Sequence, residues 1–246
     1  MDTNSKDNKS VRGPGAVYLI PWDPDSQDHI DRMKLQRIAC GWKVDEVDSW
    51  PQKQKKGVVG LHWVVLDPAH PKTPERLEAH FAAYPNATEA LPDTCKTVLG
   101  RRHKPDPLFS FFHPVGHISL DAETYEGSKL QTSLADGILS LVNFFISEPL
   151  QSVGLGGAAM DYCERMARDL FSAKAITLST IAKEECGPDS PRRIAMKRPI
   201  PKITNQDWYA RRGYVVYAEK TPGWFDIDEH GKKWPVKSIC MRKTLI

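Results

Sequence analysis

The sequence predicts an α/β protein, because apolar runs typical of strands alternate with segments of helical spacing along its 246 residues. The apolar runs are short, and several stop at a proline or a glycine, as buried strands do. The helical segments repeat their apolar residues at every third and fourth position. A hydrophobic content of 40% and a charged content of 26% are ordinary for a globular protein, so the chain can bury a sizeable core.

The first part of the chain is expected to contain a strand, a helix, a weaker helix and a second strand. Pro21 stops the first strand, and Asp25 or Ser26 can cap the helix that follows. Pro51 interrupts the weaker helix. These four elements are expected at 16–20, 26–39, 44–55 and 61–66.

Residues 68–113 differ from the rest of the chain because they carry seven prolines. A short helix is expected over 73–81, and the remainder is expected to be irregular. So long an irregular stretch inside a compact domain is usually functional or mobile. We therefore interpret it as an insertion between the second and third strands, not as a separate domain.

The second half is expected to continue with a third strand, a fourth strand, a long helix and a fifth strand. The fourth is the more continuously apolar, which is typical of a central strand. A basic, proline-containing loop then leads to a short helix and a closing pair of strands. These elements are expected at 115–120, 138–146, 155–171, 175–179, 205–212, 214–217 and 238–242.

Charge and cysteine usage limit the class of protein. A net charge of +3 indicates no basic surface for nucleic acid. The five cysteines are scattered and odd in number, which favours reduced thiols in the cytoplasm, with the nucleus as the alternative compartment, and no metal site. No apolar run approaches the roughly 20 residues of a membrane helix, so no membrane partner is expected.

The polarity of the N-terminus and the length of the chain predict the domain organisation. Residues 1–14 are polar and carry no apolar signal-peptide core, which predicts a flexible N-terminal tail. Residues 15–246 are expected to form a single domain that includes the insertion. The oligomeric state is not predicted.

The glycine-rich turn at 151–157 carries the clearest chemistry. An apolar strand ends at Pro149, and small residues lead into a helix, so backbone N–H groups and the helix N-terminus can hold an anion such as a pyrophosphate. A nucleotide P-loop is excluded because no lysine follows these glycines. The turn does fit G-x-G-x-x-A, but the acidic residue that a dinucleotide site needs about 20 positions later is absent before Glu184.

The turn also has the pattern Q-x-x-G-x-G over 151–156, which resembles the acetyl-CoA loop of the GNAT superfamily of N-acetyltransferases. A second segment, 205–214, is similar to that superfamily's N-x-x-[FW]-Y-x-x-x-G-[FY] pattern, and 239–243 is similar to its last strand. The resemblance covers 115–246 well and 16–67 loosely, and it leaves the insertion uncovered.

The resemblance implies a mixed, mostly antiparallel, twisted sheet flanked by helices. Its fourth and fifth strands are expected to part and form a slot for the pantetheine arm of acetyl-CoA. The backbone of Ile146 would pair with pantetheine amides. The N–H of Phe144 would face the thioester carbonyl and stabilise its developing negative charge, which makes it a catalytic candidate.

The same resemblance assigns the turn and the downstream segment. Tyr209 is the best candidate for the acid that protonates the leaving thiolate, and an aromatic packing on the sheet is the rival interpretation. Asn205 either bonds to pantetheine or caps its helix. The pyrophosphate would be held through main-chain N–H groups, with help from the glutamine side chain, by Gln151, Ser152, Val153, Gly154, Gly156 and Gly157.

A general base is not evident. His117 on the third strand is possible, but a lone histidine there is more often structural. Carboxylates expected in the loop before the last strand could attract a cationic amine, and a basic run after the fifth strand could meet the 3′-phosphate of CoA. Both groups are also explained by solvated loops. They are Asp226, Asp228 and Glu229, and Arg192, Arg193, Lys197 and Arg198.

The expected function is therefore transfer of an acetyl group from acetyl-CoA to a primary amine, by direct attack in a ternary complex and without a metal. The acceptor, a small molecule or a peptide amine, is not identified by any motif. One alternative is a non-catalytic, acyl-CoA-binding module that acts through partners, favoured by the missing base. A weaker one is an NAD-linked enzyme, from the formal G-x-G-x-x-A match.

Overall fold

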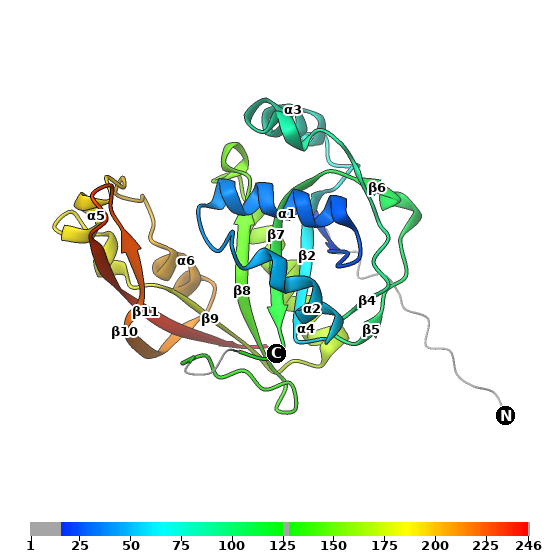
Figure 1. The fold of residues 1–246 in the computed structure, drawn as a ribbon. Helices are drawn as coiled ribbons and strands as arrows, with labels where there is room; N and C mark the ends of the chain where they lie inside the picture. Colours follow the sequence, from blue (N-terminus) through cyan, green and yellow to red (C-terminus); the bar gives the residue numbers. More distant parts are fainter. Residues whose placement is uncertain (1–15, 125–127, 246) are drawn as a thin grey trace.

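The computed structural model describes residues 16–124 and 128–245, so the predicted tail at 1–14 lies outside the described residues. Its main feature is a seven-stranded sheet in the order β1-β2-β7-β8-β9-β11-β10 (Figure 1). In that sheet β8 and β9 run parallel, and every other neighbouring pair is antiparallel. The strands are β1 Val17–Pro21, β2 Val59–Leu66, β7 Pro114–Asp121, β8 Ile138–Ile146, β9 Ala175–Ile181, β10 Val215–Ile227 and β11 Lys233–Thr244.

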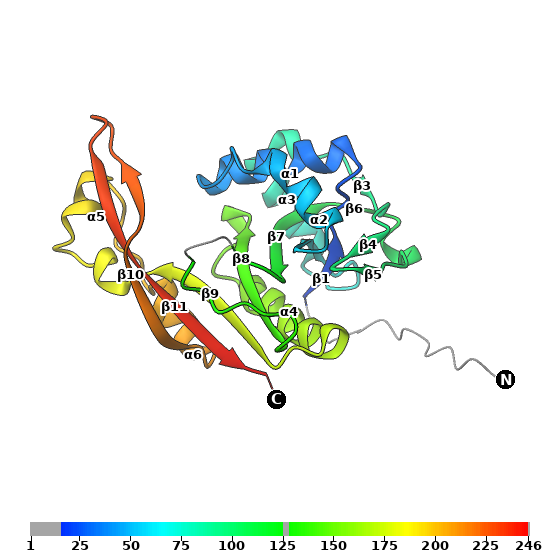
Figure 2. The same ribbon diagram turned by 60° about the horizontal axis from the view of Figure 1, so that its bottom comes forward.

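Helices cover both faces of the sheet. α1 (Gln27–Cys40) and α2 (Trp50–Lys55) lie on one face and α4 (Leu155–Phe171) on the other (Figures 1 and 2). α5 (Pro191–Ala195) and α6 (Asn205–Arg211) accompany β9, β10 and β11. The described residues also form short turns of 3-10 helix: η1 Val47–Ser49, η2 Pro85–Ala87, η3 Pro107–Phe109, η4 Glu148–Leu150 and η5 Lys183–Cys186. The predicted mixed, mostly antiparallel sheet flanked by helices is confirmed.

The sheet divides the hydrophobic core into two parts. The larger part packs α4 against one face of the sheet, through residues such as Leu155, Met160 and Ile176. The smaller part lies under α1 and α2 and contains Trp22, Trp50 and Trp63. α1 begins where Ser26 accepts a hydrogen bond from the N–H of His29 and ends at Gly41, whose φ of 72° closes the helix.

The insertion is more ordered than its sequence predicts. It contains α3 (Thr73–Ala83) and two small strand pairs, which are β3 (Leu91–Pro92) with β6 (Phe111–Phe112), and β4 (Thr97–Val98) with β5 (Arg101–Arg102). Leu91, Phe109 and Phe112 are buried in the smaller core. The helix expected over 73–81 is present as α3, whereas the two short strand pairs were not predicted, because tertiary packing and not local periodicity holds them.

The closing hairpin is also longer than predicted. The segment 218–237, expected to be mostly a loop, belongs largely to β10 and β11. It was missed because the hairpin extends away from the body of the protein (Figure 2), so much of β10 is exposed and lacks the alternation of a half-buried strand. Backbone pairing between β10 and β11 stabilises the segment instead.

Asp121 provides a test of the core. It is 6% exposed, and burial raises the pKa of its carboxyl to about 7, against the effect of a hydrogen bond from Ser119. An unfolded aspartate has a pKa of about 3.9, so between those values the native state binds more protons, and stability falls as pH rises through that window. Asp121→Asn is expected to raise the free energy of unfolding at pH 8 by roughly 2–4 kcal/mol, with little change at pH 4. Urea unfolding at both pH values measures this, and an equal effect at both would contradict it.

Candidate active site

The strands β8 and β9 part near the middle of β8. Their parallel pairing covers Ile138–Leu141 and Ala175–Leu178, after which each strand continues without the other (Figure 1). The pairing register between β7 and β8 shifts at the same level. The three residue steps from Leu141 to Phe144 on β8 lie opposite the two steps from Leu120 to Ile118 on β7. The extra residue is a β-bulge, which bends its strand. The bend accounts for the divergence, and the Asn143 N–H donates to the Ser119 hydroxyl at 3.1 Å.

The backbone groups of Phe144 and Ile146 point to the open side of β8. The Ser147 N–H donates to the Val115 carbonyl of β7 at 2.8 Å, and the Asn143 N–H is also used on the β7 side. Because N–H groups alternate between the two sides of a strand, those of Phe144 and Ile146 face away from β7. They therefore face the side on which β9 has departed.

The glycine-rich turn is exposed and its amides are free. Residues 151–154 are exposed, and Ser152 and Gly154 have φ of 64° and 90°. No backbone hydrogen bond is described for the N–H groups of 152–157, while the next one, that of Ala158, bonds to the Gly154 carbonyl. α4 begins at Leu155 without a side-chain cap or an acidic residue in its first turn. Six consecutive donors and a positive helix end therefore lie together at the surface.

Gln151 differs from its prediction. Its backbone N–H donates to the Glu148 carbonyl at 3.1 Å, and its side-chain amide donates to the Ile146 carbonyl at 2.9 Å. Its main-chain N–H is thus not available to an anion. The glutamine ties the turn to the end of β8 because it satisfies the Ile146 carbonyl there. Glu148 itself is exposed.

A row of aromatic rings connects the turn with α6. The ring centroids of Phe144 and Trp208 are 6.3 Å apart, those of Trp208 and Tyr209 5.0 Å, and those of Tyr209 and Tyr214 5.6 Å. A Cβ at Gly156 would lie 3.8 Å from both the Phe144 and Trp208 rings. The two motif segments therefore meet in space. Burial raises the pKa of the Tyr209 phenol well above its ordinary value, so the phenol stays protonated at neutral pH.

Asn205 is not the cap of its helix. α6 begins after Thr204, whose hydroxyl accepts a hydrogen bond from the Asp207 N–H at 3.1 Å. The capping interpretation of Asn205 is therefore wrong. Its side chain is exposed and makes no hydrogen bond among residues 16–124 and 128–245.

His117 belongs to the core. It is fully buried, its Nδ1 lies 2.8 Å from the Gln36 side chain, and its Nε2 lies 3.1 Å from the Arg37 guanidinium. Burial and the charge of Arg37 hold its pKa well below the ordinary histidine value. The structure thus gives His117 a packing role.

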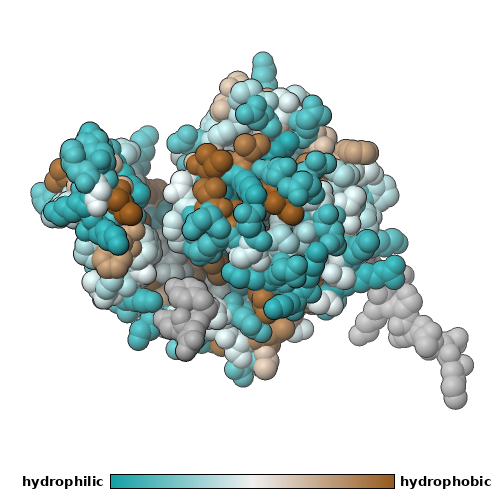
Figure 3. Space-filling view, in the orientation of Figure 1, coloured by the Kyte–Doolittle hydropathy of each residue, from teal (hydrophilic) through white to brown (hydrophobic). Residues whose placement is uncertain are grey.

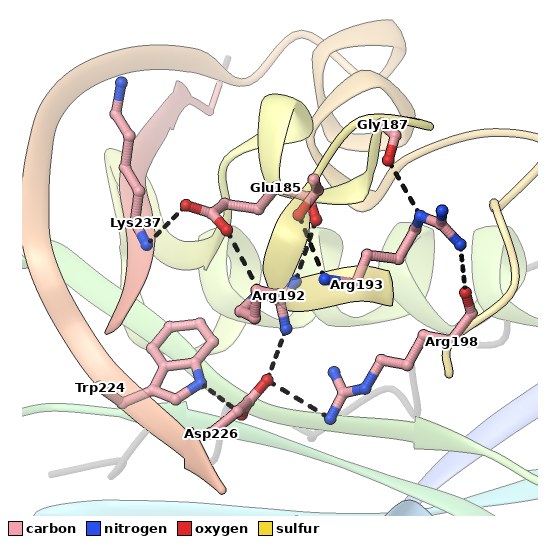
Figure 4. Close-up of polar contacts among 9 residues, drawn as sticks. Glu185, Gly187, Arg192, Arg193, Arg198, Trp224, Asp226 and Lys237 are labelled. Atoms are coloured by element: carbon pink, nitrogen blue, oxygen red, sulfur yellow. Dashed lines mark hydrogen bonds and ion pairs between the residues drawn. The ribbon is translucent and has the colours of Figure 1, made fainter. Parts of the chain in front are cut away.

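The basic run after β9 pairs with the hairpin. Arg192 is 3% exposed and contacts the carboxylates of Glu185 and Asp226, and Arg198 lies 3.5 Å from Asp226 (Figure 4). Arg193 donates to the carbonyls of residues 187, 188 and 198. These charges hold the loop against β10. Among the carboxylates considered for amine attraction, Asp226 is therefore already paired.

Arg192→Met is expected to lower the free energy of unfolding by about 3 kcal/mol, because it leaves the carboxylates of Asp226 and Glu185 without their buried partner. Acetyl-CoA affinity should not change, since the guanidinium already pairs with the carboxylates of Glu185 and Asp226. The control Lys197→Met removes a charge that is 71% exposed and should change stability by less than about 1 kcal/mol. Intact stability with weakened acetyl-CoA binding would instead identify Arg192 as a phosphate ligand.

A cavity that no sequence motif indicates lies beside Phe145 of β8. Its volume is about 260 Å³, and it is bounded by α1, α3, residues 84–87 and Phe145. Two nitrogen-bearing side chains that sequence reasoning missed, Arg32 and His80, lie in its wall. His80 was missed because it belongs to the insertion. Arg32 was missed because a single arginine in a helix resembles a surface residue.

Within 16–124 and 128–245, no helix is both long and apolar enough to cross a membrane. The same residues contain no group of three or more histidine, cysteine or acidic side chains arranged to hold a metal ion.

No protein-family model matches the chain, and no curated protein matches its sequence. Solved structures do match its fold. A chimera of the spermidine N-acetyltransferase SpeG from Vibrio cholerae and hSSAT is 8% identical over 94% of this chain and 96% of its own, with a TM-score of 0.50. NAA60 from Arabidopsis thaliana in complex with a bisubstrate analogue is 12% identical over 94% and 99%, with a TM-score of 0.49. A GNAT-family acetyltransferase from Streptococcus pneumoniae is 11% identical over 93% and 99%, with a TM-score of 0.45.

This chain has the fold of the GNAT acetyltransferases. The resemblance predicted from the motifs at 151–156 and 205–214 is confirmed at the level of the fold.

Proposed function

We propose that this protein is an acyltransferase that moves the acetyl group of acetyl-CoA to a primary amine by direct attack in a ternary complex. One observation carries the proposal: six unpartnered N–H groups at 152–157 lie at a helix N-terminus, next to the end of a strand whose parallel neighbour has diverged. A diphosphate needs such donors, and an extended arm with its own amides can take the place of a missing strand.

In this proposal the turn binds the diphosphate of CoA. The N–H groups of Ser152, Val153, Gly154, Gly156 and Gly157 donate to its oxygens, and the α4 dipole adds to the attraction. Gln151 positions the turn through its bond to the Ile146 carbonyl. Each hydrogen bond to a charged group contributes roughly 1.5–3 kcal/mol, so a few of them account for tight binding.

The open side of β8 orients the acyl group. The Ile146 N–H bonds to the pantetheine arm, and the Phe144 N–H, two residues earlier on the same side, faces the thioester carbonyl. As the amine nitrogen attacks the carbonyl carbon, negative charge develops on the oxygen. A fixed donor in that place lowers the barrier by roughly 3 kcal/mol.

The leaving sulfur takes a proton when the carbon–sulfur bond breaks. Tyr209 is the proposed donor, because its ring contacts Trp208, which packs on Phe144 of β8, and its phenol stays protonated at neutral pH. Asn205, exposed at the start of α6, is the proposed partner of a pantetheine amide. A covalent route through cysteine is disfavoured, because burial raises the pKa of both Cys163 and Cys240.

The position of His117 favours a second candidate, a module that binds acyl-CoA without turnover and acts through partners. His117 is the histidine of β7 that could have accepted a proton, but its ring is engaged by Gln36 and Arg37 in the core. Without a base, a protonated amine would not attack the thioester.

Titration calorimetry with acetyl-CoA, followed by thiol release against a panel of primary amines, tests the proposal. Saturable acetyl-CoA binding and amine-dependent release of free CoA are expected, with no thermal shift from NAD. Acetyl-CoA binding without thiol release from any amine would favour the non-catalytic module. Absence of acetyl-CoA binding would reject both.

A further inference from the structure

Part of α1 has the reverse of the usual amphipathic arrangement. Arg32, Gln36 and Arg37 are buried, whereas Leu35 and Ile38, one turn apart on the same face, are 39% and 62% exposed. A helix at the surface of a protein normally buries its apolar residues and exposes its polar ones. Hydrophobic side chains gather along α1 and between α1 and α3 (Figure 3). Exposed apolar side chains that gather in this way are typical of a surface that binds a ligand.

The exposed residues of α1 form one wall of the cavity beside Phe145. The cavity has a volume of about 260 Å³, and most of the surface that it exposes is apolar. Its apolar lining includes Leu35, Ile38, Ala39, Ala83, Tyr84 and Phe145. Each CH₂ group of a ligand that enters such a cavity leaves water, which favours binding.

The polar side chains of the lining offer a ligand few open hydrogen-bonding groups. The Gln36 amide donates to a backbone carbonyl of β7 at 2.9 Å, and its oxygen lies 2.8 Å from Nδ1 of His117. Nη1 of Arg32 and Nε2 of His80 have no partner among the described residues, but protein atoms enclose both. A ligand in the cavity therefore does not reach these two nitrogens. Asn86 is exposed. The cavity thus offers apolar contact and no charge to pair with.

The cavity lies on the side of β8 from which an acceptor would have to come. Phe144 packs on Trp208 of α6, whereas the next residue, Phe145, points to the opposite face of the sheet. There its ring lies 5.6 Å from that of His117, which contacts α1. Acetyl-CoA, as proposed above, lies on the turn at the N-terminus of α4, on the other face. The amine would therefore reach the thioester from the face of α1.

We propose that this cavity binds the apolar body of the acceptor, and that the acceptor is a small primary amine without a second charged group. The amine nitrogen lies toward β8, and the apolar body packs against α1, α3 and Phe145. This inference rests on the acyl transfer proposed above and deepens it by naming the acceptor class.

Charge and size support this class over the alternatives. A second ammonium group in the cavity would lie close to the buried guanidinium of Arg32, and like charges repel. A carboxylate would leave water without reaching a donor, because Nη1 of Arg32 and Nε2 of His80 are enclosed. Drug-sized ligands occupy roughly 300–1,000 Å³, so a cavity of about 260 Å³ suits a smaller amine.

The first test varies the acceptor. Straight-chain amines from ethylamine to octylamine are assayed for acetyl-CoA-dependent thiol release. We expect kcat/KM to rise roughly two- to fourfold with each added CH₂ group and to level off once the cavity is full. Hexylamine is then compared with 1,6-diaminohexane and 6-aminohexanoate, which add one charge to the far end of the same chain. Hexylamine should be preferred at least about tenfold, because the added charge loses its hydration in an apolar cavity.

The second test fills the cavity. Ala82 and Ala83 are both exposed at the end of α3, but of the two Ala83 lines the cavity and Ala82 does not. Ala83→Trp should reduce the ratio of kcat/KM for hexylamine to that for ethylamine at least about tenfold, because the indole occupies the space of the longer chain. The matched control Ala82→Trp should leave this ratio within about twofold of the wild-type value. Both proteins should fold, since the two positions are exposed.

A third measurement does not depend on turnover. Saturation-transfer NMR detects hexylamine bound to the protein in the absence of CoA. The signal is expected with the wild-type protein and with Ala82→Trp, and it should be lost or strongly reduced with Ala83→Trp.

These outcomes separate the two proposals. A preference for the diamine or the amino acid, no gain with chain length, or equal ratios in Ala83→Trp and Ala82→Trp would overturn the acceptor class. So would hexylamine signals that are absent from the wild-type protein or equal in the two variants. Failure to bind acetyl-CoA would instead overturn the proposed function, while the NMR signals without CoA would still decide whether the cavity takes an apolar amine.

Discussion

Gly156→Leu is expected to weaken acetyl-CoA binding by at least about a hundredfold. The N–H of Gly156 is one of the six free donors, and a side chain beside it would occupy the space that the proposal gives to the diphosphate. Each hydrogen bond to a charged group contributes roughly 1.5–3 kcal/mol, so the loss of two of them weakens binding by about a hundredfold or more. Titration calorimetry with acetyl-CoA measures it.

The fold is expected to tolerate this substitution. A Cβ at Gly156 would lie 3.8 Å from the rings of Phe144 and Trp208, which is ordinary van der Waals contact. Within a helix leucine also has a better propensity than glycine, by roughly 0.5–1 kcal/mol. Thermal unfolding should therefore show no loss of stability. A binding defect in this variant would then report on the ligand site and not on misfolding.

Gly187→Leu is the matched control. Gly187 lies in the loop after β9, has an ordinary φ of −71°, and a Cβ there would meet its nearest neighbour at 3.5 Å. The same glycine-to-leucine change is expected to leave acetyl-CoA affinity within about twofold of the wild-type value. If Gly156→Leu binds acetyl-CoA as tightly as this control, the diphosphate does not lie on the turn.

Tyr209→Phe is expected to lower kcat by about a hundredfold, the lower end of the effect of a positioned acid. The phenol is the proposed proton donor to the leaving thiolate, and phenylalanine keeps the ring that packs between Trp208 and Tyr214. Acetyl-CoA affinity should change little. Because burial raises the pKa of Tyr209, the wild-type phenol remains protonated through the neutral range, so the difference should persist from pH 6 to pH 9.

Tyr214→Phe separates the chemistry from the packing. Tyr214 is a neighbouring buried phenol whose hydroxyl donates to Glu164 at 3.2 Å. Its loss should lower stability by about 1 kcal/mol and leave kcat nearly unchanged. Equal turnover in Tyr209→Phe and wild-type protein across this pH range would remove Tyr209 from the mechanism and leave it an aromatic of the core.

The long helix at 155–171 shows what periodicity can predict. Its apolar residues repeat at every third and fourth position, and the structure places α4 over the same residues. The strand at 138–146 was predicted equally well, because it is mostly apolar. By contrast, the strands of the insertion are each only two residues long, and two residues are too few to show a period. The closing hairpin was predicted too short because much of it is exposed.

The candidate site divides in the same way. The sequence by itself determined the turn at 151–157 and the aromatic segment at 205–214, because small residues and a fixed spacing are local properties of the chain. Only the tertiary structure decided that β8 bends at a bulge and leaves β9, since that depends on the register with β7. It also decided that the basic run pairs with the hairpin. Finally, it brought Arg32 and His80 from α1 and α3 into one cavity, because contacts between side chains far apart in the chain depend on how the elements pack.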